Sequence, residues 1–330
     1  MIILADIISA TIIFAIPLLL VALGGMFSER SGTINIALEG IMIIGALFSS
    51  LFLRAADKAG WGPDHPQLAM LGAMAIGAVA GAIFSLLLAV ASVSLKADQT
   101  IGGTALNLFA PAFAIVLTWA IQGQGQTTIN IPTWIKITRD TIGLPPRQAP
   151  GFFDALFFKS TYLTTPVALV ILALTVFVIF KTRFGLRLRA CGEHPHAADS
   201  VGINVYRLRY IGVAISGFLA GIGGLAFTIA AGSGFQSTVA GYGFFALAVM
   251  IFGNWHPVRI FGAALFFALF RVIGSYSGSI PFLPTFSGIK YSQYIYQMLP
   301  YIVTMIILVF TSGKSRAPKA EGIPYDKGSR

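Results

Sequence analysis

Long apolar runs dominate this chain, and the polar stretches between them predict where helices begin and end. A transmembrane helix needs about 20 predominantly apolar residues. Five stretches of that length contain no Lys, Arg, Asp or Glu; they are residues 7–28, 66–95, 99–135, 160–180 and 291–313. A sixth such stretch, 210–258, is too long for one crossing, and glycines 232, 234, 241 and 243 indicate where it breaks.

These runs predict an all-α fold, a polytopic transmembrane helical bundle of about nine spans with broken or re-entrant helices. The expected spans are 7–27, 36–53, 68–95, 101–121, 162–180, 209–231, 241–253, 257–275 and 294–312. Asp6 precedes the first run without a basic flank, so we interpret that run as an uncleaved span. We expect one transmembrane domain, 1–312, followed by a basic, disordered cytoplasmic tail, 313–330.

The composition supports this fold class. Only 10% of the residues are charged and 56% are hydrophobic, whereas a soluble domain carries about 25% charged residues. A soluble enzyme and a nucleic-acid-binding module are therefore excluded. The single cysteine, Cys191, excludes an intramolecular disulfide.

The distribution of basic residues predicts the orientation. Segment 181–209 contains six basic and two acidic residues, and the tail contains five and two. Cytoplasmic loops collect Lys and Arg, so we expect both segments in the cytoplasm. Four spans separate them, which agrees with that placement. The N-terminus and the loops 54–67 and 122–161 then face outside.

Two polar stretches interrupt the apolar runs. In Ser28–Gly40, Asn35 and Glu39 are four residues apart and share a helix face. They either act inside the membrane, where ionisable groups are costly, or belong to a short cytoplasmic turn. In the second stretch, Thr104 and Asn107 form a polar stripe that starts near Gln99. Such a stripe hydrogen-bonds either a polar solute or another helix.

We formulate a pathway hypothesis from these stretches. A polar solute that crosses the membrane needs hydrogen-bond donors and acceptors along its path, and aromatic rings beside the glycine break can stack on a planar ring of such a solute. The proposed pathway residues are Asn35, Glu39, Gln99, Thr104, Asn107, Phe244 and Phe245. The competing interpretation is that these groups only join helix to helix.

The basic segment 181–209 contains the pattern of a short helix. Pro195 can occupy the first helical position, and Gly202 can end the helix. The composition of the segment, taken by itself, is also that of an ordinary positively charged loop.

The same segment resembles the coupling loop of permease subunits in ATP-binding-cassette importers. Ala197-Ala198-x-x-x-Gly202 is similar to the core of that loop, and Gly192-Glu193-x-Pro195 precedes it as in branched-chain amino acid, ribose and nucleoside permeases. His196 departs from the generic form, which has Glu there. The resemblance extends to three further blocks, which are 28–40, 97–107 and 241–253; the first resembles nucleoside-type permeases most closely.

This resemblance implies a nucleoside permease subunit in the inner (plasma) membrane of a bacterium. It implies three protein partners: a second permease, homologous or identical; a cytoplasmic ATPase that holds ATP and magnesium; and an external substrate-binding lipoprotein. The chain itself would hold no cofactor or metal and catalyse no reaction. The residues expected to couple to the ATPase are Gly192, Glu193, Pro195, Ala197, Ala198 and Gly202.

Three alternatives stay open at this point. The first is an ABC permease for a simple sugar such as ribose, since sugar permeases share the architecture. The second is an ion-coupled secondary transporter or channel, in which Glu39 carries a proton. The third is a membrane-embedded enzyme, for which the sequence has no paired carboxylates, metal cluster or nucleophile–base pair.

Overall fold

The computed structural model consists of helices joined by short connections. It describes residues 2–138, 161–276, 298–299, 301–302, 305–306 and 317–328. The helices are α1 (Ile2–Arg30), α2 (Leu38–Lys58), α3 (Trp61–Asp64), α4 (Pro66–Ala89), α5 (Gln99–Gln122), α7 (Thr164–Lys181), α8 (Arg183–Glu193), α9 (Pro195–Ser200), α10 (Val205–Ala231), α11 (Tyr242–Phe252) and α12 (Pro257–Tyr276). Within these residues, strand pairing is limited to two isolated bridges.

Seven of the helices are long and apolar enough to cross a membrane. They are α1, α2, α4, α5, α7, α10 and α12, and they confirm seven of the predicted spans. The predicted span 241–253 is the shorter helix α11. The predicted span 294–312 lies largely outside the described residues. The predicted class, a polytopic helical bundle, is confirmed.

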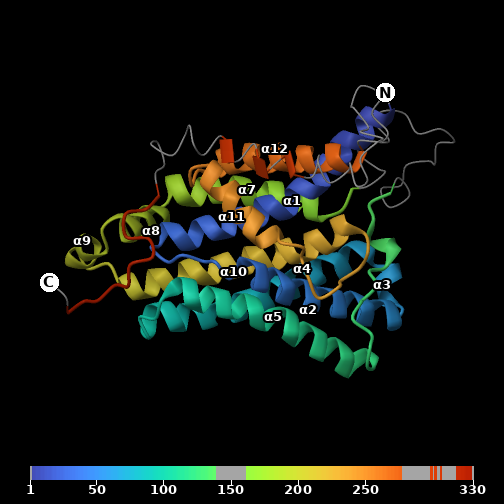
Figure 1. The fold of residues 1–330 in the computed structure, drawn as a ribbon, viewed down its shortest axis with the longest axis horizontal. Helices are drawn as coiled ribbons and strands as arrows, with labels where there is room; N and C mark the ends of the chain where they lie inside the picture. Colours follow the sequence, from blue (N-terminus) through green and yellow to red (C-terminus); the bar gives the residue numbers. More distant parts are fainter. Residues whose placement is uncertain are drawn as a thin grey trace.

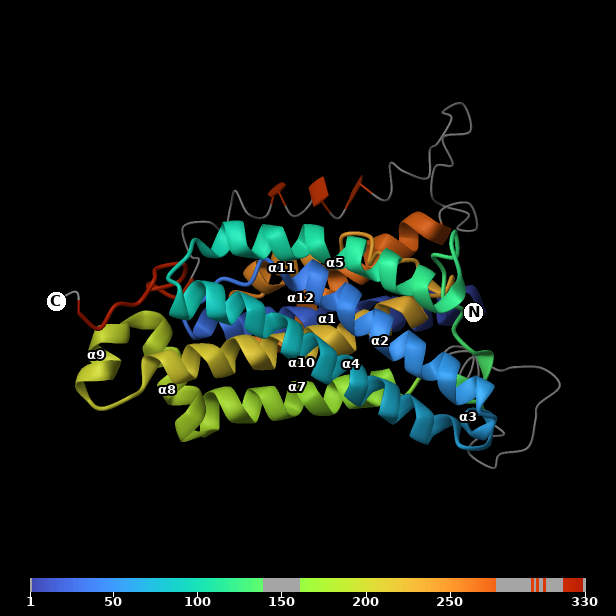
Figure 2. The same cartoon turned by 90° about the horizontal axis from the view of Figure 1, so that it is seen from below.

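The bundle has a buried centre and exposed flanks. Helix α10 is the most buried of the long helices, whereas α5 and α7 are mostly exposed. Figure 2 shows α5 and α7 on opposite sides of the bundle, with α10 between them. Helix α8, helix α9 and the end of the chain lie at one end of the bundle, called the α9 end here (Figure 1). Helix α3 and the start of α1 lie at the opposite end, the α3 end.

Two crossings are broken by extended, non-helical segments. Residues 31–37, called the first connector here, return from the α9 end to the middle of the bundle, where α2 begins (Figure 1). Residues 232–241, the second connector, join the end of α10 to the start of α11. Gly232 and Gly241 bound the second connector with φ values of +69° and +79°, which favour glycine. The predicted break of the 210–258 run at its glycines is therefore confirmed.

Glycines allow the central helices to touch through their backbones. Gly77 and Gly81 of α4 face Gly217 and Gly221 of α10, and an added Cβ at any of the four would overlap main-chain or side-chain atoms of a neighbouring helix. Such small residues let membrane helices approach closely, which increases their van der Waals contact. The two GxxxG pairs of the sequence thus pack against each other.

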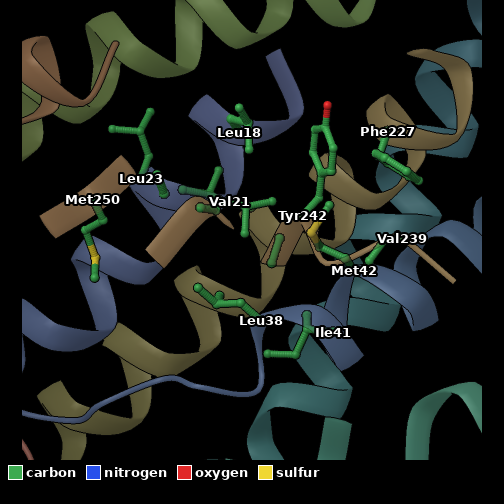
Figure 3. Close-up of a cluster of buried hydrophobic side chains, with 14 of the residues drawn as sticks. Leu18, Val21, Leu23, Leu38, Ile41, Met42, Phe227, Val239, Tyr242 and Met250 are labelled. Carbon is green, nitrogen blue, oxygen red and sulfur yellow. The ribbon is translucent and has the colours of Figure 1, made fainter. Parts of the chain in front are cut away.

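The start of α11 is embedded in the apolar core. Figure 3 shows Tyr242 surrounded by side chains of α1, α2 and α10, among them Leu18, Met42 and Phe227. Tyr242 is 1% exposed. The guanidinium of Arg271 lies 4.9 Å from its ring and 5.1 Å from the ring of Phe14. Arg271 therefore makes cation–π contacts.

The described part of the tail, 317–328, is ordered and packed at the α9 end. Tyr325 is only 4% exposed and Ala320 only 6%. The apolar side chains and main-chain groups of this segment find partners on other elements, among them Gly192 of α8.

Candidate functional site

The first connector is buried although it is not helical, so its main-chain polar groups need partners. Non-helical backbone at membrane depth is tolerated only where protein groups or water satisfy it. The side chain of Gln99 accepts a hydrogen bond from the N–H of Ile34 at 2.7 Å. Asn107 donates to the carbonyl of Ile36 and accepts from the N–H of Gly40, both at 2.8 Å. Two side chains of α5 therefore replace the missing helical hydrogen bonds.

Asn35 joins the first connector to the central helix α10. Its amide nitrogen donates to the hydroxyl of Ser216 at 2.8 Å, and its side chain is fully buried. The sequence places these two residues 181 positions apart. Asn35 therefore holds the connector on the side opposite to α5.

Glu39 connects the starts of the two interrupted helices. Its carboxylate oxygens accept hydrogen bonds from the N–H groups of Gly241 and Gly243 at 2.8 and 2.7 Å. These N–H groups are unpaired within α11 because they belong to its first turn, and a helix N-terminus attracts a negative charge. Glu39 also lies in the first turn of α2. The carboxylate of Glu39 therefore caps the N-terminus of α11, while Glu39 itself belongs to α2.

Glu39 lies well inside the bundle. Its neighbour Gly40 contacts α5 at Asn107, eight residues after the start of α5 at the α9 end. A helix rises 1.5 Å per residue, so this contact lies about 12 Å along α5. This depth favours the interpretation in which the second half of 28–40 lies inside the bundle.

Two of the seven proposed pathway residues have exposed side chains. Thr104 is exposed on α5, and its hydroxyl donates to the carbonyl of Thr100 at 2.8 Å. Phe244 is 50% exposed at the start of α11. Phe245 is 7% exposed, and its ring contacts those of Tyr242 and Phe267. The bonds of Asn35, Glu39, Gln99 and Asn107 agree with the competing interpretation, in which such groups join helix to helix.

The predicted short helix of the basic segment is α9, with Pro195 at its first position. Gly202 follows it with φ +82°. Ala197 is exposed, whereas Ala198 is 3% exposed and packs in a cluster with Cys191, Val205, Leu208 and Tyr325. The orientation of α9 therefore turns Ala198 toward this cluster and leaves Ala197 on the outer side.

Gly192 and Glu193 end α8, immediately before α9. Gly192 is buried against the main chain of Arg30, where a larger residue would not fit. Its carbonyl also accepts a hydrogen bond from the N–H of Ala320 at 2.8 Å. Of the six predicted coupling residues, Gly192 and Ala198 thus hold the loop to the bundle, and Ala197 and Gly202 are exposed.

Comparison with known proteins places this architecture in a family. The family model described as branched-chain amino acid transport system, permease component, matches residues 7–309. The chain belongs to this permease family.

The relatives are similar over nearly their whole length. The permease is 44% identical to the guanosine ABC transporter permease protein of Bacillus subtilis over 99% of this chain and 98% of the relative. It is 43% identical to a nucleoside ABC transporter permease protein of Lactococcus lactis over 97% and 96% of the two chains. It is 30% identical to a putative glucose ABC transporter permease protein of Haloferax volcanii over 84% and 79%. No solved structure matches this permease.

The family membership decides between the classes that the sequence left open. A permease component of a transport system is not itself an enzyme, and it is a multi-pass membrane protein. The relatives are named as permease proteins of ABC transporters. Neither a membrane-embedded enzyme nor an ion-coupled secondary transporter agrees with this family.

Three buried polar residues of the permease were not predicted as functional. Trp255 donates from its indole nitrogen to the carboxylate of Glu29 at 2.6 Å, which links the end of α1 to the α11–α12 turn. Arg209 is 1% exposed and donates to the carbonyl of Ile323 at 2.9 Å. Charges at the span ends indicated only the orientation of the chain. Glu29 and Arg209 each lie next to a span end, where a charge is costly to bury. That position in the sequence indicates that each charge has a specific partner.

The described residues form a large apolar groove and contain no group of metal-binding side chains. The groove, about 580 Å³, lies between α2, α4 and α5 and is lined by apolar side chains such as Phe48, Val79, Phe84 and Phe109. It offers no donor or acceptor for a nucleoside. No three His, Cys, Asp or Glu side chains come together in the described part of the chain.

Proposed function

We propose that this permease is the membrane-spanning subunit of an ATP-driven importer for nucleosides. One observation carries the proposal: two relatives named as nucleoside or guanosine ABC transporter permeases match nearly the whole chain at 43–44% identity. The putative glucose permease is only 30% identical over a smaller share. A simple sugar is therefore the second candidate substrate.

The α9 end is the cytoplasmic end in this proposal, and α9 docks on the ATPase. Ala197 and Val201 are one helical turn apart and both exposed, with Val201 at 75%. Together they present a small apolar surface outside the membrane-spanning segments. ATP and magnesium bind to the ATPase, and the lipoprotein delivers the nucleoside at the α3 end, where the N-terminus lies. The complex resides in a bacterial inner membrane.

The passage runs along the exposed side of α5 and α11. Thr104 offers a hydroxyl for the nucleoside, and Phe244 offers a ring on which a base can stack. Both side chains are exposed on this chain, so the passage needs a second wall. A second permease, homologous or identical, supplies it. Asn35, Glu39, Gln99 and Asn107 support the connectors behind this surface.

Uptake with competitors tests the proposed function. The permease is reconstituted in vesicles with its ATPase, second permease and binding lipoprotein, and uptake of labelled guanosine is measured with excess uridine, ribose or glucose. We expect ATP-dependent uptake that uridine reduces and the sugars do not. Equal competition by ribose would favour the sugar permease. Uptake on a proton or sodium gradient without the ATPase would contradict the importer.

Two substitutions on α5 separate support from transport. Asn107→Ala removes two hydrogen bonds to the first connector, so it is expected to lower the free energy of unfolding by about 1–3 kcal/mol. Its transport rate per folded complex should stay close to the original. Thr104→Val removes only a hydroxyl bonded within its own helix, so it should preserve the melting temperature in detergent and slow uptake.

Thr104→Ser, which keeps the hydroxyl, is the matched control for Thr104→Val. Original uptake by Thr104→Val would remove Thr104 from the pathway. A slower rate per folded complex in Asn107→Ala, at unchanged melting temperature, would instead place Asn107 on it. Asn35→Ala is measured in parallel, because Asn35 supports the connector from α10.

A further inference from the structure

The tail segment 317–328 contacts α9 directly. The ring of Tyr325 lies 5.1 Å from that of His196 on α9 and 5.3 Å from that of Tyr206 on α10. Tyr325 also belongs to the buried cluster that contains Ala198. The ammonium group of Lys327 lies 3.6 Å from the carboxylate of Asp199. One side of the tail thus packs on the helix proposed to meet the ATPase.

The same segment contacts the first connector and the end of α1. Gly322 lies against the side chain of Ile34 in the connector. The carboxyl group of Glu321 hydrogen-bonds that of Glu29 on α1, and burial raises the pKa of Glu321. Arg209 reaches the tail through the carbonyl of Ile323 and lies against Gly32 of the connector.

A third contact ties the tail to the turn between α4 and α5. The ammonium group of Lys96 lies 2.8 Å from the carboxylate of Asp326. Lys96 has φ +54°, so the turn it occupies is a specific local conformation. Both side chains are partly exposed, and an exposed ion pair contributes only about 0–1 kcal/mol. This ion pair therefore contributes little to the free energy that keeps the tail in its position.

Helix α9 depends on such contacts for its position. It has six residues, and isolated helices shorter than about 12–15 residues are marginal in water. Its inward side rests on a small cluster in which Tyr325 contributes the largest side chain. Removal of Tyr325 would leave Ala198 and Cys191 facing a void.

We propose that residues 317–328 form a strap that fixes α9 to the first connector, so that movement of α9 on the ATPase is transmitted through the connector to the start of α2, where Glu39 lies. The inference rests on the proposed function, because it takes α9 as the ATPase contact. Tyr325 is a positioning residue in this strap, not a residue that contacts the nucleoside. The strap gives the tail a mechanical part in coupling ATP hydrolysis to transport.

Tyr325→Ala tests the strap, with Tyr325→Phe as the matched control that keeps the ring. The reconstituted complex is assayed for three quantities: the amount of ATPase that co-purifies, ATP hydrolysis, and labelled guanosine transported per ATP. We expect Tyr325→Ala to retain the ATPase while transport per ATP falls at least about fivefold, the lower end of common coupling effects. Tyr325→Phe should behave as the original.

Cys191 supplies an independent readout. It is the single cysteine of the chain and fully buried, and burial raises the pKa of its thiol to about 11. A neutral buried thiol reacts slowly with maleimide. Because Cys191 shares its cluster with Tyr325, loss of the strap should accelerate maleimide labelling of the folded complex.

The outcomes distinguish the strap from the proposed function. Original transport per ATP and original labelling in Tyr325→Ala would overturn the strap. Failure of the unaltered permease to retain the ATPase or to transport guanosine would instead overturn the proposed function. If Tyr325→Ala does not insert, Tyr325→Leu, which fills part of the volume without a ring, replaces it in the same three assays.

Discussion

Glu39→Ala, at the start of α2, is expected to destabilise the permease more than single substitutions in the two connectors. It leaves the N–H groups of Gly241 and Gly243 without an acceptor inside the bundle. A buried donor left unpaired costs about 1–3 kcal/mol, so the two together cost about 2–6 kcal/mol. Folded proteins have a net stability of only about 5–15 kcal/mol. The substitution therefore removes a substantial part of the net stability.

Thermal unfolding in detergent and the yield of monodisperse protein measure this effect. Glu39→Gln keeps one acceptor oxygen but directs an amide N–H₂ at the second donor, so we expect an intermediate loss. Glu193→Gln, on a partly exposed side chain at the end of α8, is the matched control and should have little effect. A melting temperature of Glu39→Ala equal to that of the control would contradict the assigned hydrogen bonds.

Ala197→Trp is expected to separate the permease from its ATPase without unfolding it. Ala197 is exposed on α9, so a bulky ring there meets solvent in the free chain and overlaps the partner in the complex. Steric overpacking costs about 1–3 kcal/mol, which corresponds to about 5–150-fold weaker binding. ATP hydrolysis stimulated by the permease should fall to that of the ATPase alone.

Ala198→Trp is the informative contrast. Ala198 is buried against Cys191 and Leu208, so a large ring there should disrupt the loop and lower the melting temperature. Ala197→Ser, which stays small, should preserve both stability and stimulated hydrolysis. Retention of the ATPase by Ala197→Trp at the original affinity, measured by co-purification over a concentration series, would remove this face of α9 from the docking surface.

Several features were predictable because they depend on local composition. The hydrocarbon core of a membrane requires a run of about 20 apolar residues, and such runs located seven long helices without any tertiary information. Gly232 and Gly241 indicated the second break because glycine alone adopts positive φ at little cost. Pro195 and Gly202 marked α9 by the same local physics.

The roles of the polar residues were not predictable in this way. Asn107 and the connector carbonyl that it binds are 71 positions apart, and Glu39 and Gly243 are 204 apart. A polar stripe on a helix looks the same whether it faces a solute or the backbone of another segment. Only the packing that brings the first connector against α5 shows that Gln99 and Asn107 satisfy main-chain groups.

The sequence by itself determined that this chain is a multi-span helical membrane protein, that the 210–258 run is interrupted at its glycines, and that the basic loop contains a short helix. These properties follow from hydrophobicity, glycine and proline, which act over a few residues. Only the tertiary structure decided that Glu39 joins two half-helices, that Ala198 faces inward while Ala197 faces outward, and that the tail packs on α9. Each of these depends on which distant segments meet, because an unpaired buried polar group or a void takes its partner from whatever element the fold places beside it.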